Sequence, residues 1–251
     1  MVQIKTIRNW LILGILIVVF ASGCANLGQV QTHEVKPIPP EELPSGNGWW
    51  RARFRMNWPL DTDPVWHMDL YLAHQAIRPL LEKNKADIYL WRFHRRAKRD
   101  KAGRQFTFYF YSSPRTAQQI FDALQSNPIV IDALSAGVID DIVYDNPADI
   151  KRPDIDDASD KNWPLLIQRT WPYYITGVSQ MWLNLVVEVA ERDLKAHRPA
   201  SLEEIDAFYR QVDETITELW QKTGRHAFLH HLNAVFEYQP LIYWEKRYLE
   251  F

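Results

Sequence analysis

The chain has 251 residues, of which 47% are apolar and 13% are aromatic, and its formal net charge is −2. A chain of this size and composition can bury a sizeable core. Its slightly acidic balance disfavours general nucleic-acid binding, which depends on an excess of positive charge. It contains a single cysteine, so no disulfide can form within the chain, and its stability must come from packing.

Residues 1–23 have the pattern of an export signal. Two basic residues precede an apolar stretch from Trp10 to Phe20, and three small residues follow it. The stretch is shorter than the roughly 20 apolar residues that a membrane-spanning helix needs. We therefore expect residues 1–23 to be a signal peptide that is removed.

The residues Ala21-Ser22-Gly23-Cys24 directly follow the apolar stretch and resemble the lipobox of bacterial lipoproteins. The resemblance implies a thioether between Cys24 and diacylglycerol, cleavage between Gly23 and Cys24, and acylation of the new amino terminus. Cys24 is therefore the expected lipid-attachment site, and a membrane is the expected partner. A retained signal anchor and a buried free thiol are the alternative interpretations.

Residue 25 bears on the location of the protein. It is Ala, whereas an Asp at this position retains well-studied Gram-negative lipoproteins at the inner membrane. The same resemblance therefore implies the cell envelope, at the periplasmic face of the outer membrane. Each buried methylene group contributes about 0.8 kcal/mol, so two or three acyl chains would make the attachment practically permanent.

The chain after the signal divides into four predicted regions. Residues 24–48 carry the cysteine and are polar and rich in proline and glycine, with no helical or alternating pattern, which predicts a flexible tether. An α+β domain is predicted at 49–145, an acidic linker that contains proline at 146–163, and a helical region at 164–251.

The α+β domain is predicted to contain four strands and two helices. Apolar and polar residues alternate in WRARFRMNW, which indicates a strand with one apolar and one basic face. Asp63 with Pro64, and Ser113 with Pro114, are typical of the first residues of a helix. The predicted strands are residues 50–58, 86–93, 104–111 and 138–144.

This order of strand, helix, strand, strand, helix, strand matches the ferredoxin-like βαββαβ motif. In that motif two helices cover one face of a four-stranded antiparallel sheet. The resemblance is architectural and covers about residues 49–145. Many unrelated functions occur on such folds, so the resemblance predicts no activity.

The helical C-terminal half begins with a long apolar segment. Residues 173–194 are apolar over much of their surface and predict a central packed helix rather than a membrane span. Residues 201–224 begin with Ser201 and Glu204 as a capping box, and Gly224 is expected to end this helix. A further helix and an aromatic tail follow.

No catalytic, cofactor-binding or metal-binding residue is predicted. The chain has no GxSxG, P-loop or GxGxxG motif. His226 and His230 lie four residues apart, with His231 beside them, but no HExxH or CxxC motif supplies further ligands. The acidic residues between 154 and 160 lack the central glycine and the closing glutamate of an EF-hand loop, so a linker is expected there.

The segment that joins the two strands of the predicted hairpin is the most densely basic part of the chain. Its functional interpretation is contact with an anionic surface, such as phospholipid head groups or an acidic partner. The alternative is a solvated loop whose charges keep a sheet edge soluble. Arg51, Arg53 and Arg55 would extend the basic surface if their face of the sheet is open. The candidate contact residues are Arg95, Arg96, Lys98, Arg99, Lys101 and Arg104.

These features predict a lipid-anchored periplasmic envelope protein that acts as a binding or assembly component, with no cofactor and no evident catalysis. Its expected partner is an envelope protein or an anionic lipid, and not nucleic acid. The alternative is an envelope hydrolase or glycan-binding protein that would use exposed tryptophan rings and carboxylates such as Asp140, Asp141 or Glu237. Two close carboxylates in a cleft would favour this alternative.

Overall fold

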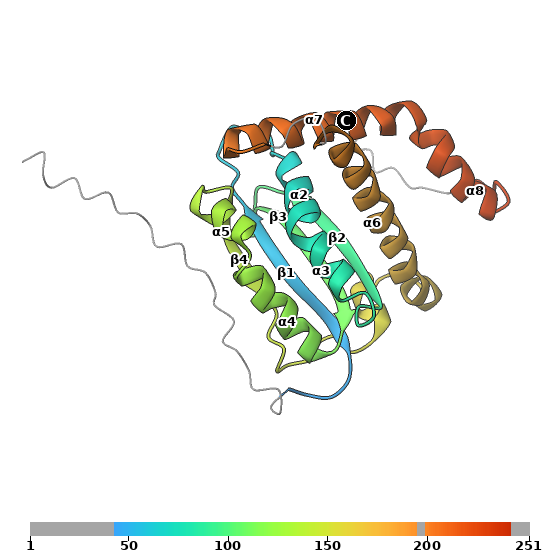
Figure 1. Cartoon of the computed structure of the whole chain (residues 1–251). Helices are drawn as coiled ribbons and strands as arrows, with labels where there is room; N and C mark the ends of the chain where they lie inside the picture. The colour runs from blue at the N-terminus through green and yellow to red at the C-terminus, as the bar shows by residue number, and fades with distance from the viewer. Residues whose placement is uncertain (1–42, 195–198, 242–251) are drawn as a thin grey trace, which may run out of the picture. The chain divides into compact units, whose positions relative to one another are not determined.

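The computed structural model describes residues 43–194 and 199–241 of the chain (Figure 1). They form an α+β structure around a four-stranded sheet with the strand order β2-β3-β1-β4. All three strand pairs, β1 with β3, β1 with β4 and β2 with β3, are antiparallel. The predicted α+β class is therefore confirmed. The strands are β1 (Gly48–Met56), β2 (Leu90–Ala97), β3 (Arg104–Ser112) and β4 (Ile139–Tyr144).

The side chains of β1 alternate between a buried and an open face of the sheet, as its sequence predicts. The even-numbered residues from Trp50 to Met56 are buried, and the three arginines between them lie on the opposite face. β3 continues the buried face with Phe106, Phe108 and Phe110, and the rings of Phe108 and Phe110 stack with centroids 5.0 Å apart. The core is therefore built largely from aromatic side chains of the central strands.

Helices cover the buried face of the sheet, and Figure 1 shows α2, α3 and α4 lying across it. The π-helical segment η2 joins α2 to α3 without a break in the helical run. The predicted cap of α4 is present, because the Ser113 side chain accepts a hydrogen bond from the Thr116 N–H at 3.2 Å. These elements are α2 (His67–Tyr71), η2 (Leu72–Ile77), α3 (Arg78–Lys83), α4 (Pro114–Gln125) and α5 (Pro128–Ser135).

The first helix begins at His67 and not at Asp63 and Pro64, as the sequence pattern predicted. Arginines of the β2–β3 hairpin bind backbone carbonyls that precede His67, and of these the Trp66 carbonyl also accepts a hydrogen bond from the Asp69 N–H at 3.1 Å. Residues before His67 are consequently held as a loop. Arg99 binds the carbonyls of Pro59 and Thr62, Arg104 binds that of Val65, and Arg95 binds that of Trp66.

Helix α6 (Leu165–Leu194) runs beside β2, which is an edge strand of the sheet (Figure 1). The Trp91 N–H donates a hydrogen bond to Thr176 Oγ1 at 3.3 Å, and the Phe93 N–H donates to Ser179 Oγ at 3.1 Å. Two backbone donors of the edge strand are thereby satisfied by helix side chains, which protects the edge from further pairing. The predicted packed helix is confirmed here, although it begins earlier than expected.

Removal of these hydroxyl groups should destabilise the protein. We expect Thr176→Val and Ser179→Ala each to lower the free energy of unfolding by about 1–3 kcal/mol, because a buried N–H of β2 then has no partner. Urea denaturation followed by circular dichroism measures the change. Thr170→Val is the matched control, because the Thr170 hydroxyl is exposed and binds carbonyls of its own helix, those of Leu166 at 2.9 Å and Ile167 at 3.3 Å. If all three variants lost the same stability, the hydroxyls would not protect the edge.

Helix α7 (Leu202–Gly224) packs across α2 and belongs to the same core as the sheet. Its first residue follows the predicted cap, because the Ser201 side chain accepts a hydrogen bond from the Glu204 N–H at 3.2 Å. Tyr209, Val212 and Ile216 of this helix are buried, together with residues of α6 and the sheet. Among the described residues, the structure contains no helix with both the length and the apolar character needed to cross a membrane.

Gly224 is the last residue of α7, as expected, but it does not stop the helical run. Its φ is −59°, a helical value, and the chain continues through η4 (Arg225–His230) into α8 (His231–Val235). A Cβ atom at this position would lie 2.8 Å from the ring of Trp220. The glycine therefore leaves room for the tryptophan ring and does not supply a turn.

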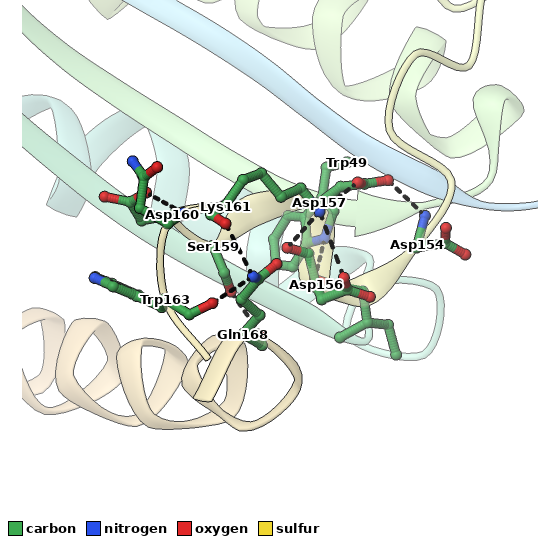
Figure 2. A network of polar contacts seen from close by, with 11 residues as sticks. Trp49, Asp154, Asp156, Asp157, Ser159, Asp160, Lys161, Trp163 and Gln168 are labelled. Carbon is green, nitrogen blue, oxygen red and sulfur yellow. Dashed lines mark hydrogen bonds and ion pairs between the residues drawn. The ribbon is translucent and has the colours of Figure 1, made fainter. Parts of the chain in front are cut away.

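The acidic segment after β4 contacts the face of the sheet opposite the helices. It contains the short helix η3 (Ile155–Ala158). Trp49 Nε1 donates to the Ile155 carbonyl at 2.8 Å, and the Tyr111 hydroxyl donates to the Pro153 carbonyl at 2.8 Å. These contacts cover the end of the sheet where β1 begins, and Figure 2 shows Trp49 beside the segment.

Candidate functional site

Two of the six candidate contact residues, Arg95 and Arg104, lie on the helix-covered face of the sheet. Arg104 is 1% exposed and donates to Asp69 Oδ1 at 2.7 Å, and Arg95 donates to the other oxygen, Oδ2, at 2.9 Å. Both guanidinium groups also lie over the ring of Trp66, at 5.0 and 4.8 Å from its centroid. Arg104 is therefore not part of an exposed basic surface, and Arg95 is committed to the buried carboxylate of Asp69.

The other four candidates, Arg96, Lys98, Arg99 and Lys101, lie at the tip of the β2–β3 hairpin and are here called the tip surface. Lys98, Arg99 and Lys101 are exposed. Arg96 forms an ion pair with Asp100, and this contact is the largest of the causes that lower the pKa of Asp100 to about 2. Arg99 stacks on Trp58 with its guanidinium carbon 3.4 Å from the ring centroid. The tip surface therefore contains two arginines held by side-chain contacts, Arg96 and Arg99, and two exposed lysines, Lys98 and Lys101.

A hollow of about 340 Å³ opens beside the tip surface. Arg55, Trp58, Lys98, Arg99 and Asp140 are among the residues that line it. Burial raises the pKa of Asp140, the neighbouring carboxylate of Asp141 adds to this effect, and Arg55 opposes it. Four basic residues, Arg55, Lys98, Arg99 and Arg104, and two carboxylates, Asp100 and Asp140, line the hollow, which is therefore predominantly cationic.

The uncovered face of the sheet carries basic side chains on two strands. Arg51, Arg53 and Arg55 occupy this face of β1, as the sequence predicts. The register places the Cα of Arg51 opposite that of Tyr109 on β3, and Tyr109 lies opposite Arg92 on β2. Two residues further along the strands, Arg53, Thr107 and His94 form the next row. The basic residues of β1 and β2 thus flank the uncharged side chains of β3.

Only part of this positive charge is balanced by carboxylates. Asp145 accepts from Arg51 Nε at 3.1 Å and from Arg51 Nη2 at 3.0 Å, and it also pairs with Arg152. Among the described residues, Arg53 makes no ion pair, and Arg53 Nε is buried without a hydrogen-bond partner. Arg92 Nε is likewise buried and unpartnered, while its guanidinium carbon lies 4.0 Å from the Tyr109 ring centroid and 5.1 Å from that of Trp171.

Burial is the main cause of the lowered pKa values on this face, whereas for Arg51 the contact with Asp145 outweighs burial and raises the pKa. Burial lowers the pKa of Arg53, and the neighbouring Arg51 lowers it further. Burial also lowers the pKa of Arg92 and of His94, and for His94 the charges of Arg92 and Arg96 add to the effect. Each direction indicates that the charged form of the group is disfavoured by its partial burial.

The acidic residues of the η3 segment are engaged with their neighbours (Figure 2). The Asp154 N–H donates to Asp157 Oδ2 at 2.9 Å, and Asp160 Oδ1 accepts from the Asn162 N–H at 2.9 Å. Lys161 reaches toward Asp156 and Asp157 and donates to Asp157 Oδ1 at 2.9 Å. These carboxylates therefore cap a short helix and neutralise one lysine.

Three histidines gather near the end of the described chain. The rings of His226, His230 and His231 lie with centroids 5.0 to 5.5 Å apart. His230 Nε2 lies 3.3 Å from the Tyr238 hydroxyl. No set of three or more His, Cys, Asp or Glu residues within 43–194 and 199–241 is arranged to hold a metal ion.

A buried polar contact between α2, η2 and α7 was not foreseen from the sequence. His67 is 4% exposed, and its Nε2 lies 2.7 Å from Asp206 Oδ1. His74 Nδ1 lies 3.0 Å from the Tyr209 hydroxyl, and burial together with the charge of Arg78 lowers the pKa of His74. The spacing of seven residues between the two histidines, which places both on one face of a helix, was the signal available in the sequence.

The remaining candidates are dispersed. Asp140 and Asp141 belong to β4, whereas Glu237 lies in the turn after α8. A second hollow, of about 520 Å³, lies between α3 and α6 and is lined by Trp91, Leu183 and other apolar and polar residues. The expected signal peptide and the lipid-attachment residue Cys24 lie outside the described residues.

The arrangement of these groups suits the binding of anions. It offers unpaired guanidinium groups on the sheet face and exposed cations at the hairpin tip. Comparisons of this chain with family models, with curated proteins and with solved structures find no match. Its function must therefore be inferred from its own residues.

Proposed function

We propose that this chain is a lipid-anchored protein of the cell envelope that acts as a binding or assembly component and contacts an anionic partner through its tip surface. The lipobox-like residues that end at Cys24 and the tether-like composition of residues 24–48 support the anchor and its location at the periplasmic face of the outer membrane. The observation that carries the binding role is the tip surface, where Lys98, Arg99 and Lys101 are exposed beside a cationic hollow.

We also propose that residues 49–145 have the ferredoxin-like form of the α+β class. The strand order β2-β3-β1-β4 supports this assignment, because the sheet places β3 between β1 and β2, and β1 between β3 and β4. The chain passes from β1 to β2 through α2 to α3, and from β3 to β4 through α4 and α5, so each helical connection joins two strands that have another strand between them. In this form the helices from α2 to α5 cover one face of the sheet, and the arginines of β1 lie on the other.

The partner that we propose for the tip surface is a membrane containing anionic phospholipid. Each exposed basic residue near such a surface contributes about 1 kcal/mol, and the attraction decays within a Debye length of about 10 Å at 0.1 M salt. Since the lipid anchor already supplies attachment, these charges would orient the folded part and would not determine membrane residence.

Removal of the three exposed charges should abolish most of this binding. A soluble variant that begins at Gln29 retains every described element. We expect it to bind vesicles made of equal parts phosphatidylcholine and phosphatidylglycerol. Simultaneous Lys98→Gln, Arg99→Gln and Lys101→Gln replacement should weaken this binding on the order of 100-fold, since three contributions of about 1 kcal/mol are lost. Vesicle co-sedimentation at low and moderate salt measures both effects.

The control for this experiment removes the same charge elsewhere. Lys83, Lys85 and Lys222 are exposed on α3, in the turn after it and on α7, and their triple replacement by Gln gives the same net charge. This variant should bind the vesicles as the parent does. Equal binding by the tip variant and the parent would leave the tip surface as a solvated loop. Equal loss in both triple variants would mean that only net charge matters.

A further inference from the structure

We infer that Arg53 and Arg92, with Tyr109 between them, form a binding site for a phosphomonoester group on the open face of the sheet. This site is separate from the tip surface, and it does not depend on the membrane contact proposed above. It accounts for two buried guanidinium nitrogens that have no partner in the described structure.

The sheet register brings these side chains to one place. Tyr109 is directly opposite Arg51 on one side and Arg92 on the other. Arg53 lies two residues beyond Arg51 on the same face, so it is a diagonal neighbour of Tyr109 at about 7–8 Å between Cα atoms. Long side chains reach across this distance. Guanidinium groups that originate on β1 and β2 can therefore approach one ligand from both sides of β3.

The charge balance leaves room for an anion. Arg51 and Arg152 share the carboxylate of Asp145, and these three groups together carry one excess positive charge. Arg53 and Arg92 add two further charges and form no ion pair with a described residue, whereas Asp141 of β4, whose Cα lies opposite that of Arg55, is a second carboxylate on this face and offsets the charge of Arg55. A partly buried cation without a counterion is unfavourable, and a bound anion removes this cost.

The charge of the two guanidinium groups without ion pairs, Arg53 and Arg92, selects the class of anion. A phosphomonoester carries about −1.5 to −2 charges at neutral pH, which matches the two unpaired guanidinium groups, whereas a carboxylate or a phosphodiester carries one. The planar guanidinium group also offers paired N–H donors that fit phosphate oxygens. A phosphomonoester therefore fits better than a carboxylate or a phosphodiester.

The aromatic neighbours hold one side of the site in place. The Arg92 guanidinium lies 4.0 Å from the ring centroid of Tyr109 and 5.1 Å from that of Trp171, which comes from α6. Stacking between two rings restricts the orientation of the guanidinium before a ligand arrives. Little further conformational entropy of the Arg92 side chain is therefore lost when a ligand binds.

Titration with a soluble phosphomonoester tests the inference. The full chain, purified in a nonionic detergent, is titrated with glycerol phosphate by isothermal calorimetry. We expect saturable binding that Arg53→Gln and Arg92→Gln each weaken about tenfold or more, because each variant loses a charge-assisted contact. Arg53→Lys should fall between the wild type and Arg53→Gln, since the charge remains but the paired donors are lost.

The matched control is Arg55→Gln, which removes a charge from the same face of the same strand. The Arg55 guanidinium binds the Lys101 carbonyl at 2.5 Å and lies two residues beyond Arg53, so its removal should change the affinity by less than about twofold. Thermal unfolding shows whether each variant is folded. If Arg92→Gln unfolds because Trp171 loses its contact, Arg53→Gln decides the test alone.

Other ligands identify the class and the source of the phosphate. Acetate and dimethyl phosphate carry one charge each. Both should bind at least about tenfold more weakly than glycerol phosphate. Phosphatidic acid added to the micelles presents the same group on a lipid. Equal affinity for both forms assigns the site to the phosphomonoester itself, and tighter binding of phosphatidic acid assigns it to a lipid head group.

Two results would overturn the inference: no binding of either phosphomonoester by the wild type, or undiminished binding by a folded Arg53→Gln variant. The outcome is distinguishable from that of the tip surface. The triple tip variant should keep its affinity for glycerol phosphate while losing the vesicles, and Arg53→Gln should do the reverse.

Discussion

Replacement of Cys24 by Ser is expected to abolish lipid attachment. The proposed thioether needs the nucleophilic sulfur of the only cysteine in the chain, and a hydroxyl group does not replace it. Cells fed a clickable palmitate analogue should label the wild type and leave the variant unlabelled. The variant should also accumulate as an uncleaved precursor, larger by the 23 residues that precede Cys24.

A neighbouring replacement provides the control for this experiment. Ala25→Asp leaves the cysteine in place, so labelling should be retained. By the resemblance to Gram-negative lipoproteins, this variant should move from the outer to the inner membrane, as sucrose-gradient fractionation would show. Undiminished labelling of Cys24→Ser would contradict the lipoprotein proposal, and a retained signal anchor would then become the better interpretation of residues 1–23.

Replacement of Asp69 by Asn is expected to lower the free energy of unfolding by about 3–5 kcal/mol, because it leaves a buried cation without its counterion. Asp69 and Arg104 are 0% and 1% exposed, and Arg104 already has two nitrogens, Nε and Nη1, without a partner. Arg95 loses its carboxylate contact in the same variant. Urea denaturation, with tryptophan fluorescence and circular dichroism as independent probes, measures the change.

Two further variants isolate the cause of this destabilisation. Asp132→Asn alters an exposed carboxylate on α5 and should change the stability by less than about 0.5 kcal/mol. Asp69→Leu combined with Arg104→Met removes both charges and should recover much of the loss, because replacement of a buried ion pair by apolar groups is often nearly neutral. A loss below about 1 kcal/mol in Asp69→Asn would show that the pair does not hold the hairpin to α2.

Local patterns in the sequence predicted the elements whose neighbours in the chain determine them. The alternation along β1 predicted both its strand and the placement of Arg51, Arg53 and Arg55 on one face. Ser113 and Ser201 predicted the first residues of α4 and α7, because a cap acts on amides within the next turn. Such features depend on contacts between near neighbours and need no knowledge of the tertiary fold.

The errors concern residues whose role depends on distant partners. Arg95 and Arg104 were grouped with the tip residues by their proximity in the chain, yet strand alternation with Phe93 and Phe106 places them on the core face. That signal was present in the sequence but was outweighed by charge density. The start of α2 at His67 could not be predicted from the neighbouring sequence, because arginines of the β2–β3 hairpin bind the carbonyls of Val65 and Trp66 just before it.

The two edges of the sheet differ in a way that limits how the protein can associate. Thr176 and Ser179 of α6 occupy donors along β2, whereas β4 pairs with β1 on one side and with no further strand of the described chain on the other. Strand-by-strand growth requires two open edges in each molecule. A sheet with one open edge can accept a single strand or join one twin copy edge to edge, and the assembly then stops. At the membrane that we propose for it, crowding would consequently lead to pairs of this protein and not to fibres.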